Sequence, residues 1–91
     1  MTSYKAVYIR VYGVVQGVGF RALVKRWAKE MDLKGYVRNL SDGSVEIHVE
    51  GCEHIIQNFI ERLKHEAPVD IWDMEISETS VRGYNDFYIA F

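Results

Sequence analysis

The sequence has little of several features that would place it in a specialised class of protein. A single cysteine, Cys52, allows no internal disulfide, so the fold does not need an oxidising compartment. One proline and the lack of any low-complexity tract argue against a disordered linker. Neither a signal peptide nor an apolar run long enough to span a bilayer is present. These absences predict a cytoplasmic protein with no membrane association.

A strong basic excess is missing as well. The 91 residues carry a formal net charge of −2, which argues against a nucleic-acid partner. This length predicts a single domain covering residues 1–91. A domain of this size buries only about 60% of its unfolded surface, so its core has to be continuous. The 48% of residues that are hydrophobic can supply such a core.

Hydrophobic periodicity divides the first half of the chain into a strand, a helix and a hairpin. Residues 6–12 alternate between apolar and polar, which predicts a strand with one buried face. Over residues 21–32 the apolar positions recur at three- and four-residue spacing, which is typical of an amphipathic helix. Strand-like runs at 35–41 and 44–50 flank Asp42-Gly43, a strong signal for a hairpin turn.

The second half continues with a helix and then strands. A helical stripe begins at Cys52 and ends near His65, shortly before Pro68. Two strand patterns follow, at 69–77 and 87–91, with a loop around 81–83 between them. One face of the first of these strands carries Trp72, Met74 and Ile76.

The order β-α-β-β-α-β, with its last element split in two, predicts an α+β ferredoxin-like sandwich. In this fold an antiparallel sheet carries two helices on one face. The first and second strands run parallel with the third between them, so their C-terminal ends share one sheet edge. Asn39, near the end of the second strand, should then lie about 10 Å from the end of the first. It shares the parity of Val37, so we expect it to face the first helix and Arg21.

A glycine-rich stretch, residues 13–21, joins the first strand to the first helix. It reads Gly-Val-Val-Gln-Gly-Val-Gly-Phe-Arg, with three glycines in seven positions and no charge before Arg21. Such a loop can direct several backbone N–H groups at one place. Arg21 stands in the first helical turn, where the helix dipole disfavours a cation by roughly 0.3–1 kcal/mol. A bound anion reconciles the free donors with the arginine.

The candidate catalytic residues are therefore Arg21 and Asn39. Arginine stabilises phosphate charge but does not shuttle protons, and asparagine can hold and aim a water molecule. No acid, base, nucleophile or magnesium ligand obviously joins them. Such a site suits a substrate with a good leaving group. The leaving group of an acyl phosphate is a carboxylate, which is a stable anion. We expect a site that needs no metal and no cofactor.

Two motifs resemble those of the acylphosphatase family. Residues 13–21 resemble its first signature, and residues 35–51, GYVRNLSDGSVEIHVEG, resemble its second. The resemblance implies a ferredoxin-like enzyme that cleaves the carboxyl–phosphate bond of a small acyl phosphate without a metal. Arg21 would bind the substrate phosphate, and Asn39 would orient the attacking water. The backbone N–H groups that also bind phosphate would be those of Gln16, Gly17, Val18, Gly19 and Phe20.

A second hypothesis is a binding or regulatory module that uses the same fold without turnover. Such a module would act on carbamoyl phosphate or dock to a larger maturation factor, although no obligate protein partner is evident from the sequence. A dinucleotide-binding loop is excluded, since the region that should carry its acidic residue reads Val37-Arg38-Asn39.

The outer face of the predicted sheet is rich in aromatic and charged residues. In this fold class such a face can stack RNA bases, but acidic residues on the central strand and the negative net charge disfavour RNA here. We expect a solvated face or a protein contact instead, with surface histidines and a buried Cys52. The residues on this face are Tyr8, Arg10, Tyr12, Tyr36, Arg38, Glu46, His48, Glu50 and Tyr88.

Overall fold

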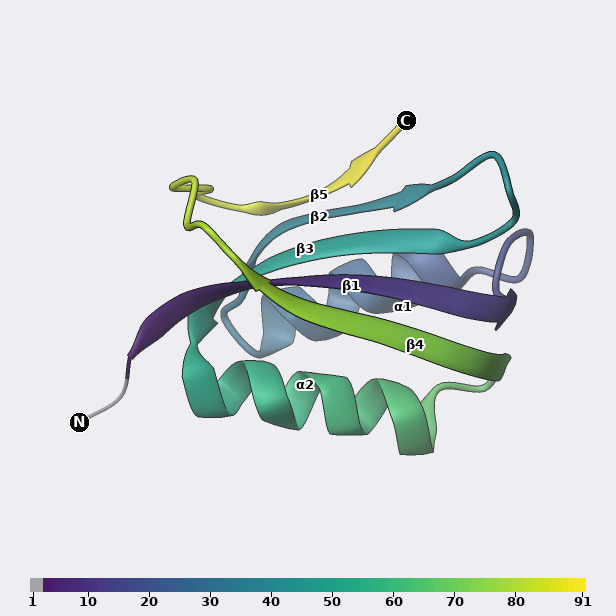
Figure 1. Ribbon diagram of the computed structural model, residues 1–91, viewed down its shortest axis with the longest axis horizontal. Helices are drawn as coiled ribbons and strands as arrows, with labels where there is room; N and C mark the ends of the chain where they lie inside the picture. The colour runs from purple at the N-terminus through teal and green to yellow at the C-terminus, as the bar shows by residue number, and fades with distance from the viewer. Residues whose placement is uncertain (1–2) are drawn as a thin grey trace.

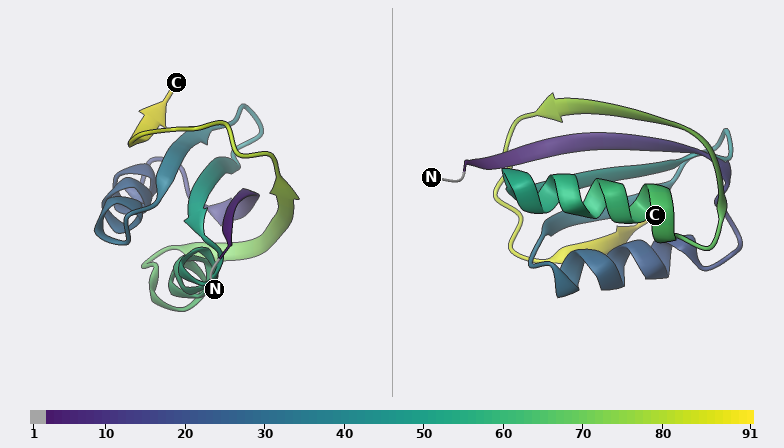
Figure 2. Two further views of the ribbon diagram at one scale, coloured as in Figure 1. Left: turned by 90° about the vertical axis from the view of Figure 1, so that its left-hand side faces the viewer. Right: turned by 90° about the horizontal axis from the view of Figure 1, so that it is seen from below.

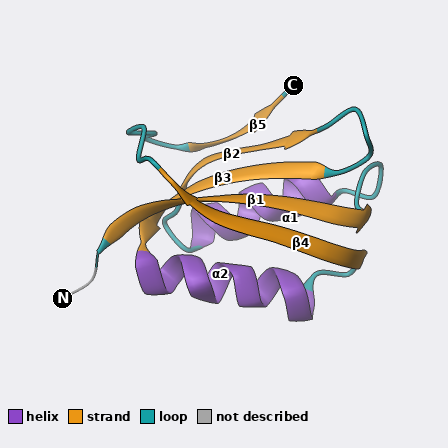
Figure 3. Ribbon diagram, in the orientation of Figure 1, coloured by secondary structure: helices purple, strands orange, loops and turns teal. Residues whose placement is uncertain are grey.

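A computed structural model describes residues 3–91 of the chain. Five strands and two helices follow one another in the order β1, α1, β2, β3, α2, β4, β5 (Figures 1 and 3). Their bounds are β1 Tyr4–Val14, α1 Phe20–Glu30, β2 Lys34–Asn39, β3 Val45–Cys52, α2 Glu53–Glu66, β4 Asp70–Thr79 and β5 Phe87–Ala90. The last predicted element is thus divided into two strands, as the periodicity indicated.

The strands form one sheet in the order β4-β1-β3-β2-β5. β3 is antiparallel to both β1 and β2, so β1 and β2 run parallel with β3 between them, as predicted. The expectation of a wholly antiparallel sheet is wrong in one place, because β5 pairs parallel to β2. The chain leaves β4 at one edge, crosses to the other edge and there runs in the direction of β2.

Both helices pack on the same face of the sheet, as Figure 2 shows in its end-on view. Their apolar stripes meet the inward side chains of the central strands in one continuous core. Fully buried members include Val24 of α1, Phe59 of α2 and Ile47 of β3. Neither helix within residues 3–91 is long and apolar enough to cross a membrane.

The β2–β3 connection is the predicted hairpin, although its loop is longer than a two-residue turn. Residues 40–44 separate the strands, and the Leu40 N–H donates to the Ser44 carbonyl at 2.9 Å. Only Gly43 in this loop has a positive φ, of 92°. Asp42 accepts hydrogen bonds from the backbone and hydroxyl of Ser44, and these hold the pKa of Asp42 at about 2. The loop is therefore closed by an aspartate turn rather than by two left-handed residues.

β4 contains a bulge that the alternation of its sequence does not reveal. Tyr12 pairs with Asp73 and Gly13 with Ile71, which leaves Trp72 without a partner on β1. Trp72 is 74% exposed, whereas Met74 packs against the core. The prediction that Trp72 shares a face with Met74 is therefore wrong.

The polar residues of β3 are buried, contrary to the expectation of a solvated outer face. Glu46 accepts hydrogen bonds from the hydroxyls of Tyr8 at 2.8 Å and Tyr36 at 2.9 Å, and Arg38 pairs with it at 2.8 Å. Burial raises the pKa of the Glu46 carboxyl, but these partners outweigh it and the net pKa is lowered. Burial and the bond to Glu46 raise the pKa of Tyr8 to about 12.

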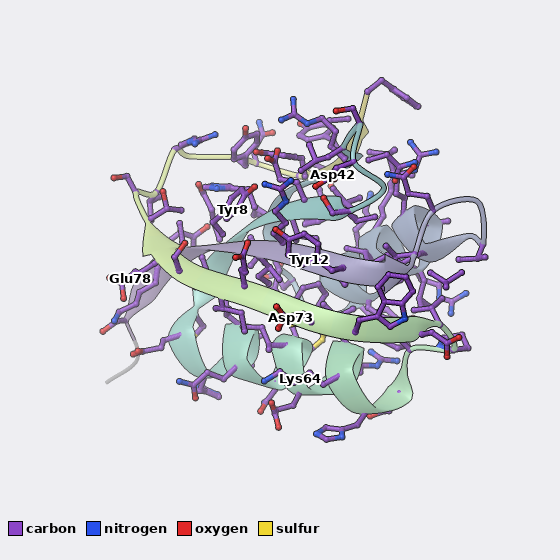
Figure 4. All side chains as sticks on the ribbon, turned by 45° about the vertical axis from the view of Figure 1, so that its right-hand side comes forward. Tyr8, Tyr12, Asp42, Lys64, Asp73 and Glu78 are labelled. Atoms are coloured by element: carbon purple, nitrogen blue, oxygen red, sulfur yellow. The ribbon has the colours of Figure 1, made fainter. Side chains whose placement is uncertain are left out.

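His48 and Glu50 are fully inaccessible to solvent, so the prediction of a surface His48 is wrong. The Nε2 of His48 lies 2.7 Å from a Glu50 carboxylate oxygen, and Tyr36 stacks on the imidazole ring. Glu50 also accepts from the backbone N–H groups of residues 82–84, at 2.6–3.2 Å. These bonds hold the β4–β5 connection against the outer face. Figure 4 shows Tyr8 and Tyr12 of β1 on this face, away from Lys64 of α2.

Two smaller expectations about reactive side chains have different outcomes. His54 and His65 are exposed, as predicted. Cys52 is the last residue of β3 and the N-cap of α2 rather than a buried member of the helical stripe, and it is partly exposed.

Candidate active site

The loop between β1 and α1 owes its shape to two glycines. Gly17 and Gly19 have φ angles of 74° and 79°, in the left-handed region that other residues rarely adopt. A Cβ atom at either position would meet nothing within 4 Å, so backbone conformation and not space requires glycine here. Gly19 is also the N-cap of α1 and supplies no side chain to cap it. The first turn of the helix contains no acidic residue.

The backbone N–H groups of residues 16–20 have no acceptor within the described part of the chain. None of the hydrogen bonds found among residues 3–91 is donated by the N–H of residues 16–20. Free N–H groups at a helix N-terminus are suited to binding an anion. The positive end of the α1 dipole acts in the same direction.

Arg21 follows directly in the first turn of α1. Across the described part of the chain, no carboxylate lies within 4.0 Å of its guanidinium, whereas most other arginines are paired. The Arg21 guanidinium instead lies over the ring of Phe91, with its carbon 5.5 Å from the ring centroid. This cation–π contact leaves the forked N–H groups available for an anion.

A pocket of about 220 Å³ brings the loop, Arg21 and the end of the chain together. Gly17, Gly19, Phe20 and Arg21 line it on one side. Val15, Ala22, Ile89 and Phe91 complete the lining. Of the residues predicted to bind phosphate, Gln16 and Val18 do not line this pocket, and Val18 instead lines a neighbouring groove with Val14 and residues 67–70.

Asn39 is the last residue of β2 and lies opposite Val45 of β3, a core residue on the helix-facing side. Its side chain therefore points to the same side of the sheet as α1, as predicted. The Asn39 Oδ1 atom is buried and has no hydrogen-bond partner, so one acceptor remains unused. Asn39 is not among the residues that line the pocket of Arg21.

The side chain of Gln16 connects the two halves of the site, which sequence reasoning missed. Its Nε2 donates to the carbonyl oxygens of Leu40 at 2.7 Å and Ser44 at 2.9 Å. The glycine loop is thereby attached to the residue that follows Asn39. In Figure 1 this loop and the β2–β3 connection lie together at the right-hand end of the sheet. One signal was available, since Gln16 is the only polar side chain between Gly13 and Arg21.

A family model described as Acylphosphatase matches residues 7–89. The chain belongs to the acylphosphatase family. Among curated acylphosphatases, that of Thermotoga petrophila is 44% identical over 88 residues, which cover 96% of this chain and 98% of the relative. The crystal structure of acylphosphatase from Bacillus subtilis matches with a TM-score of 0.91 at 38% identity, covering 98% of this chain and all of the other.

The acylphosphatase-like domain also occurs within a much longer protein. The structure of full-length HypF in its phosphate- and nucleotide-bound form matches with a TM-score of 0.92 at 38% identity. This chain is covered completely by that match but spans only 12% of the HypF chain.

Membership of the acylphosphatase family confirms several sequence-based predictions. The chain is a hydrolase of the acylphosphatase type, which acts on small acyl phosphates. Its α+β ferredoxin-like fold is confirmed by the structural matches, with the mixed sheet noted above.

Proposed function

We propose that the chain hydrolyses acyl phosphates with Arg21 and Asn39 as catalytic residues and with the N–H groups of residues 16–20 as the phosphate cradle. The observation that carries the proposal is the row of N–H groups without acceptors at the start of α1, next to an arginine without a carboxylate partner. A phosphate group bound there would accept from the backbone donors and from the guanidinium fork.

The proposed reaction is a displacement at phosphorus by water. A water molecule held by the Asn39 side chain attacks phosphorus and forms a new P–O bond. The bond between phosphorus and the acyl oxygen breaks, and its electron pair leaves with the carboxylate. The protons of the attacking water stay on inorganic phosphate, so the products are a carboxylate and dihydrogen phosphate. Arg21 and the cradle stabilise the negative charge of the transferring phosphoryl group.

The chemistry of the leaving group explains why the proposal includes neither a general acid nor a metal ion. Carboxylic acids have pKa values of about 4, so the carboxylate leaves as a stable anion at neutral pH. Among residues 3–91, no three His, Cys, Asp or Glu side chains are grouped so as to hold a metal ion. The proposed reaction accordingly assigns no step to a metal ion.

Two substitutions and one additive test the proposal with benzoyl phosphate as substrate. Asn39→Ala should lower kcat by about 10²–10³-fold while inorganic phosphate still binds, because only the water loses its partner. Arg21→Ala should weaken both phosphate binding and turnover. Excess EDTA should leave the wild-type rate unchanged. Arg26→Ala, an exposed arginine on the same helix, provides the matched control. Full activity in a folded Asn39→Ala or Arg21→Ala variant would disprove these roles.

A second candidate function is action on carbamoyl phosphate, and the similarity to HypF favours considering it. A relative of this chain, 46% identical over 87 residues, is named as the probable carbamoyltransferase HypF of Methanocaldococcus jannaschii. Acetyl phosphate and carbamoyl phosphate are nearly the same size and differ in a methyl against an amino group. A kcat/KM for carbamoyl phosphate at least tenfold above that for acetyl phosphate would favour this candidate. Equal values or the reverse order would favour the general acylphosphatase.

A further inference from the structure

A second pocket lies on the outer face of the sheet, on the side away from the helices. Its volume is about 420 Å³, and its lining consists of Tyr36, Arg38, Arg82, Tyr84, Tyr88 and Ala90. Tyr36 pairs with Tyr88 and Arg38 with Ala90 in the parallel β2–β5 register, so these four side chains share one face. The pocket of Arg21 shares no lining residue with this one. We name the second pocket the tyrosine–arginine groove.

The lining of the tyrosine–arginine groove includes two arginines and no acidic residue. No carboxylate within residues 3–91 lies within 4.0 Å of the Arg82 guanidinium. Arg38 donates to Glu46 through Nη2 at 2.8 Å, but its Nε is buried without an acceptor. Glu46 therefore compensates the charge of Arg38 and also accepts from two tyrosines, whereas Glu50 accepts from His48 and the backbone of residues 82–84. The exposed Arg82, which has no acidic partner among residues 3–91, therefore points to an anionic ligand group.

The aromatic side of the groove offers stacking surfaces. Tyr84 is tilted by 55° to Tyr36 and by 54° to Tyr88, with ring centroids 6.0 and 6.5 Å apart. Tyr88 is 45% exposed, so much of its ring is free. Its hydroxyl donates to the Asn85 side chain at 3.0 Å, which fixes the ring orientation. A planar aromatic ligand can stack on such a ring.

We infer that the tyrosine–arginine groove binds a planar aromatic ring that carries a phosphate group, and specifically a nucleoside monophosphate. The base would stack on Tyr88, and the phosphate would accept from the guanidinium groups of Arg82 and Arg38. A mononucleotide fits better than RNA, since polynucleotide binding depends on neutralising many phosphates and this face offers few cations on a chain of net charge −2.

Isothermal titration of the full chain with AMP, adenosine and inorganic phosphate at low salt tests the inference. AMP should bind, and adenosine alone should bind at least tenfold more weakly. Arg82→Gln and Tyr88→Ala should each weaken AMP binding by about tenfold, which is the loss expected for one charged hydrogen bond or one stacked base. The Arg82 substitution leaves its backbone bond to Glu50 in place, and a melting curve checks that both variants fold.

Two controls separate the tyrosine–arginine groove from other sites. Arg26→Gln removes the same charge from the exposed side of α1 and should leave AMP binding unchanged. Arg21→Ala removes the proposed phosphate site, so the AMP binding that persists in this variant should be the part that Arg82→Gln weakens. The inference is overturned if AMP does not bind, if Arg21→Ala but not Arg82→Gln abolishes binding, or if adenosine binds as tightly as AMP. A trinucleotide that binds more than tenfold tighter than AMP would overturn the choice of a mononucleotide.

Discussion

The side chain of Gln16 positions the glycine loop against the β2–β3 connection in the candidate site. It donates two hydrogen bonds across the gap between the glycine loop and the β2–β3 connection. The two acceptor carbonyls, of Leu40 and Ser44, also accept backbone N–H groups, from Gly43 and Leu40 respectively. Both carbonyl groups therefore keep a hydrogen-bond donor when the Gln16 amide is removed. The main effect should be poorer alignment of the proposed cradle with Asn39.

We predict that Gln16→Met lowers kcat/KM for benzoyl phosphate by about tenfold and lowers the free energy of unfolding by about 1–2 kcal/mol, the worth of two hydrogen bonds. Methionine keeps the length of the side chain but cannot donate. Gln57→Met on the exposed side of α2 is the control and should change neither quantity. Steady-state kinetics and urea unfolding measure both effects. Unchanged kcat/KM in Gln16→Met would show that the loop is aligned without this side chain.

At the scale of elements, the glycine loop and the β2–β3 loop provide a matched pair of left-handed glycines. Gly19 and Gly43 have φ angles of 79° and 92°, and a Cβ at either would meet nothing within 4 Å. We predict that Gly19→Ala and Gly43→Ala each cost about 1–2 kcal/mol of stability, the price of a left-handed alanine. Only Gly19→Ala should also weaken phosphate binding, because its N–H belongs to the proposed cradle. Equal loss of phosphate affinity in both variants would contradict the assignment of the cradle.

The elements also show which parts of the fold could be predicted from the sequence. Strands, helices and their order follow from local periodicity, and the position of Asn39 beside the glycine loop follows from that order. The burial of His48 could not be predicted, because alternation marks it as an outward polar residue. The His48 ring packs against Tyr36 and against Tyr84, and Tyr84 lies 36 positions further along the chain. The parallel pairing of β5 likewise depends on where the β4–β5 connection crosses the sheet.

Within the candidate site the same division between local and distant contacts holds. The glycine loop and Arg21 are contiguous in the sequence, so one short stretch is enough to predict an anion-binding site. The acceptors of Gln16 lie 24 and 28 positions away, and Phe91 reaches Arg21 from the end of the chain. No local pattern encodes contacts of that separation.

At the scale of the whole molecule, Glu50 connects the centre of the sheet to the segment that leads into its last strand. The chain leaves β4 at one edge and crosses the outer face before β5 forms the other edge (Figure 1). Three backbone N–H groups of this crossing, in residues 82–84, donate to the Glu50 carboxylate. β5 then carries Ile89 to the pocket of Arg21. One buried carboxylate thus holds a segment that contributes to the site.

This arrangement predicts a specific dependence of stability on pH. Burial raises the pKa of Glu50, but the bonds from His48 and from the backbone of residues 82–84 outweigh it and leave the pKa lowered. A carboxyl whose folded pKa lies below its unfolded value of about 4.3 adds stability that is complete above that value and is lost as the pH falls below it. Glu50→Gln should therefore be less stable than wild type at pH 7, by about 1–3 kcal/mol, because the amide keeps one acceptor oxygen and places an NH2 donor where the second oxygen accepts hydrogen bonds.

The difference between wild type and Glu50→Gln should then shrink as the pH is lowered from 5 towards 3, where the wild-type carboxylate becomes protonated. Urea unfolding at several pH values measures it directly. Glu66→Gln, an exposed glutamate on α2, is the control and should follow wild type at every pH. Other acids with lowered pKa values, such as Asp42 and Glu46, are common to all three proteins, so their contribution cancels in the difference. A gap that stays constant from pH 7 to pH 3 would show that the ionised Glu50 carboxylate does not hold the crossing segment.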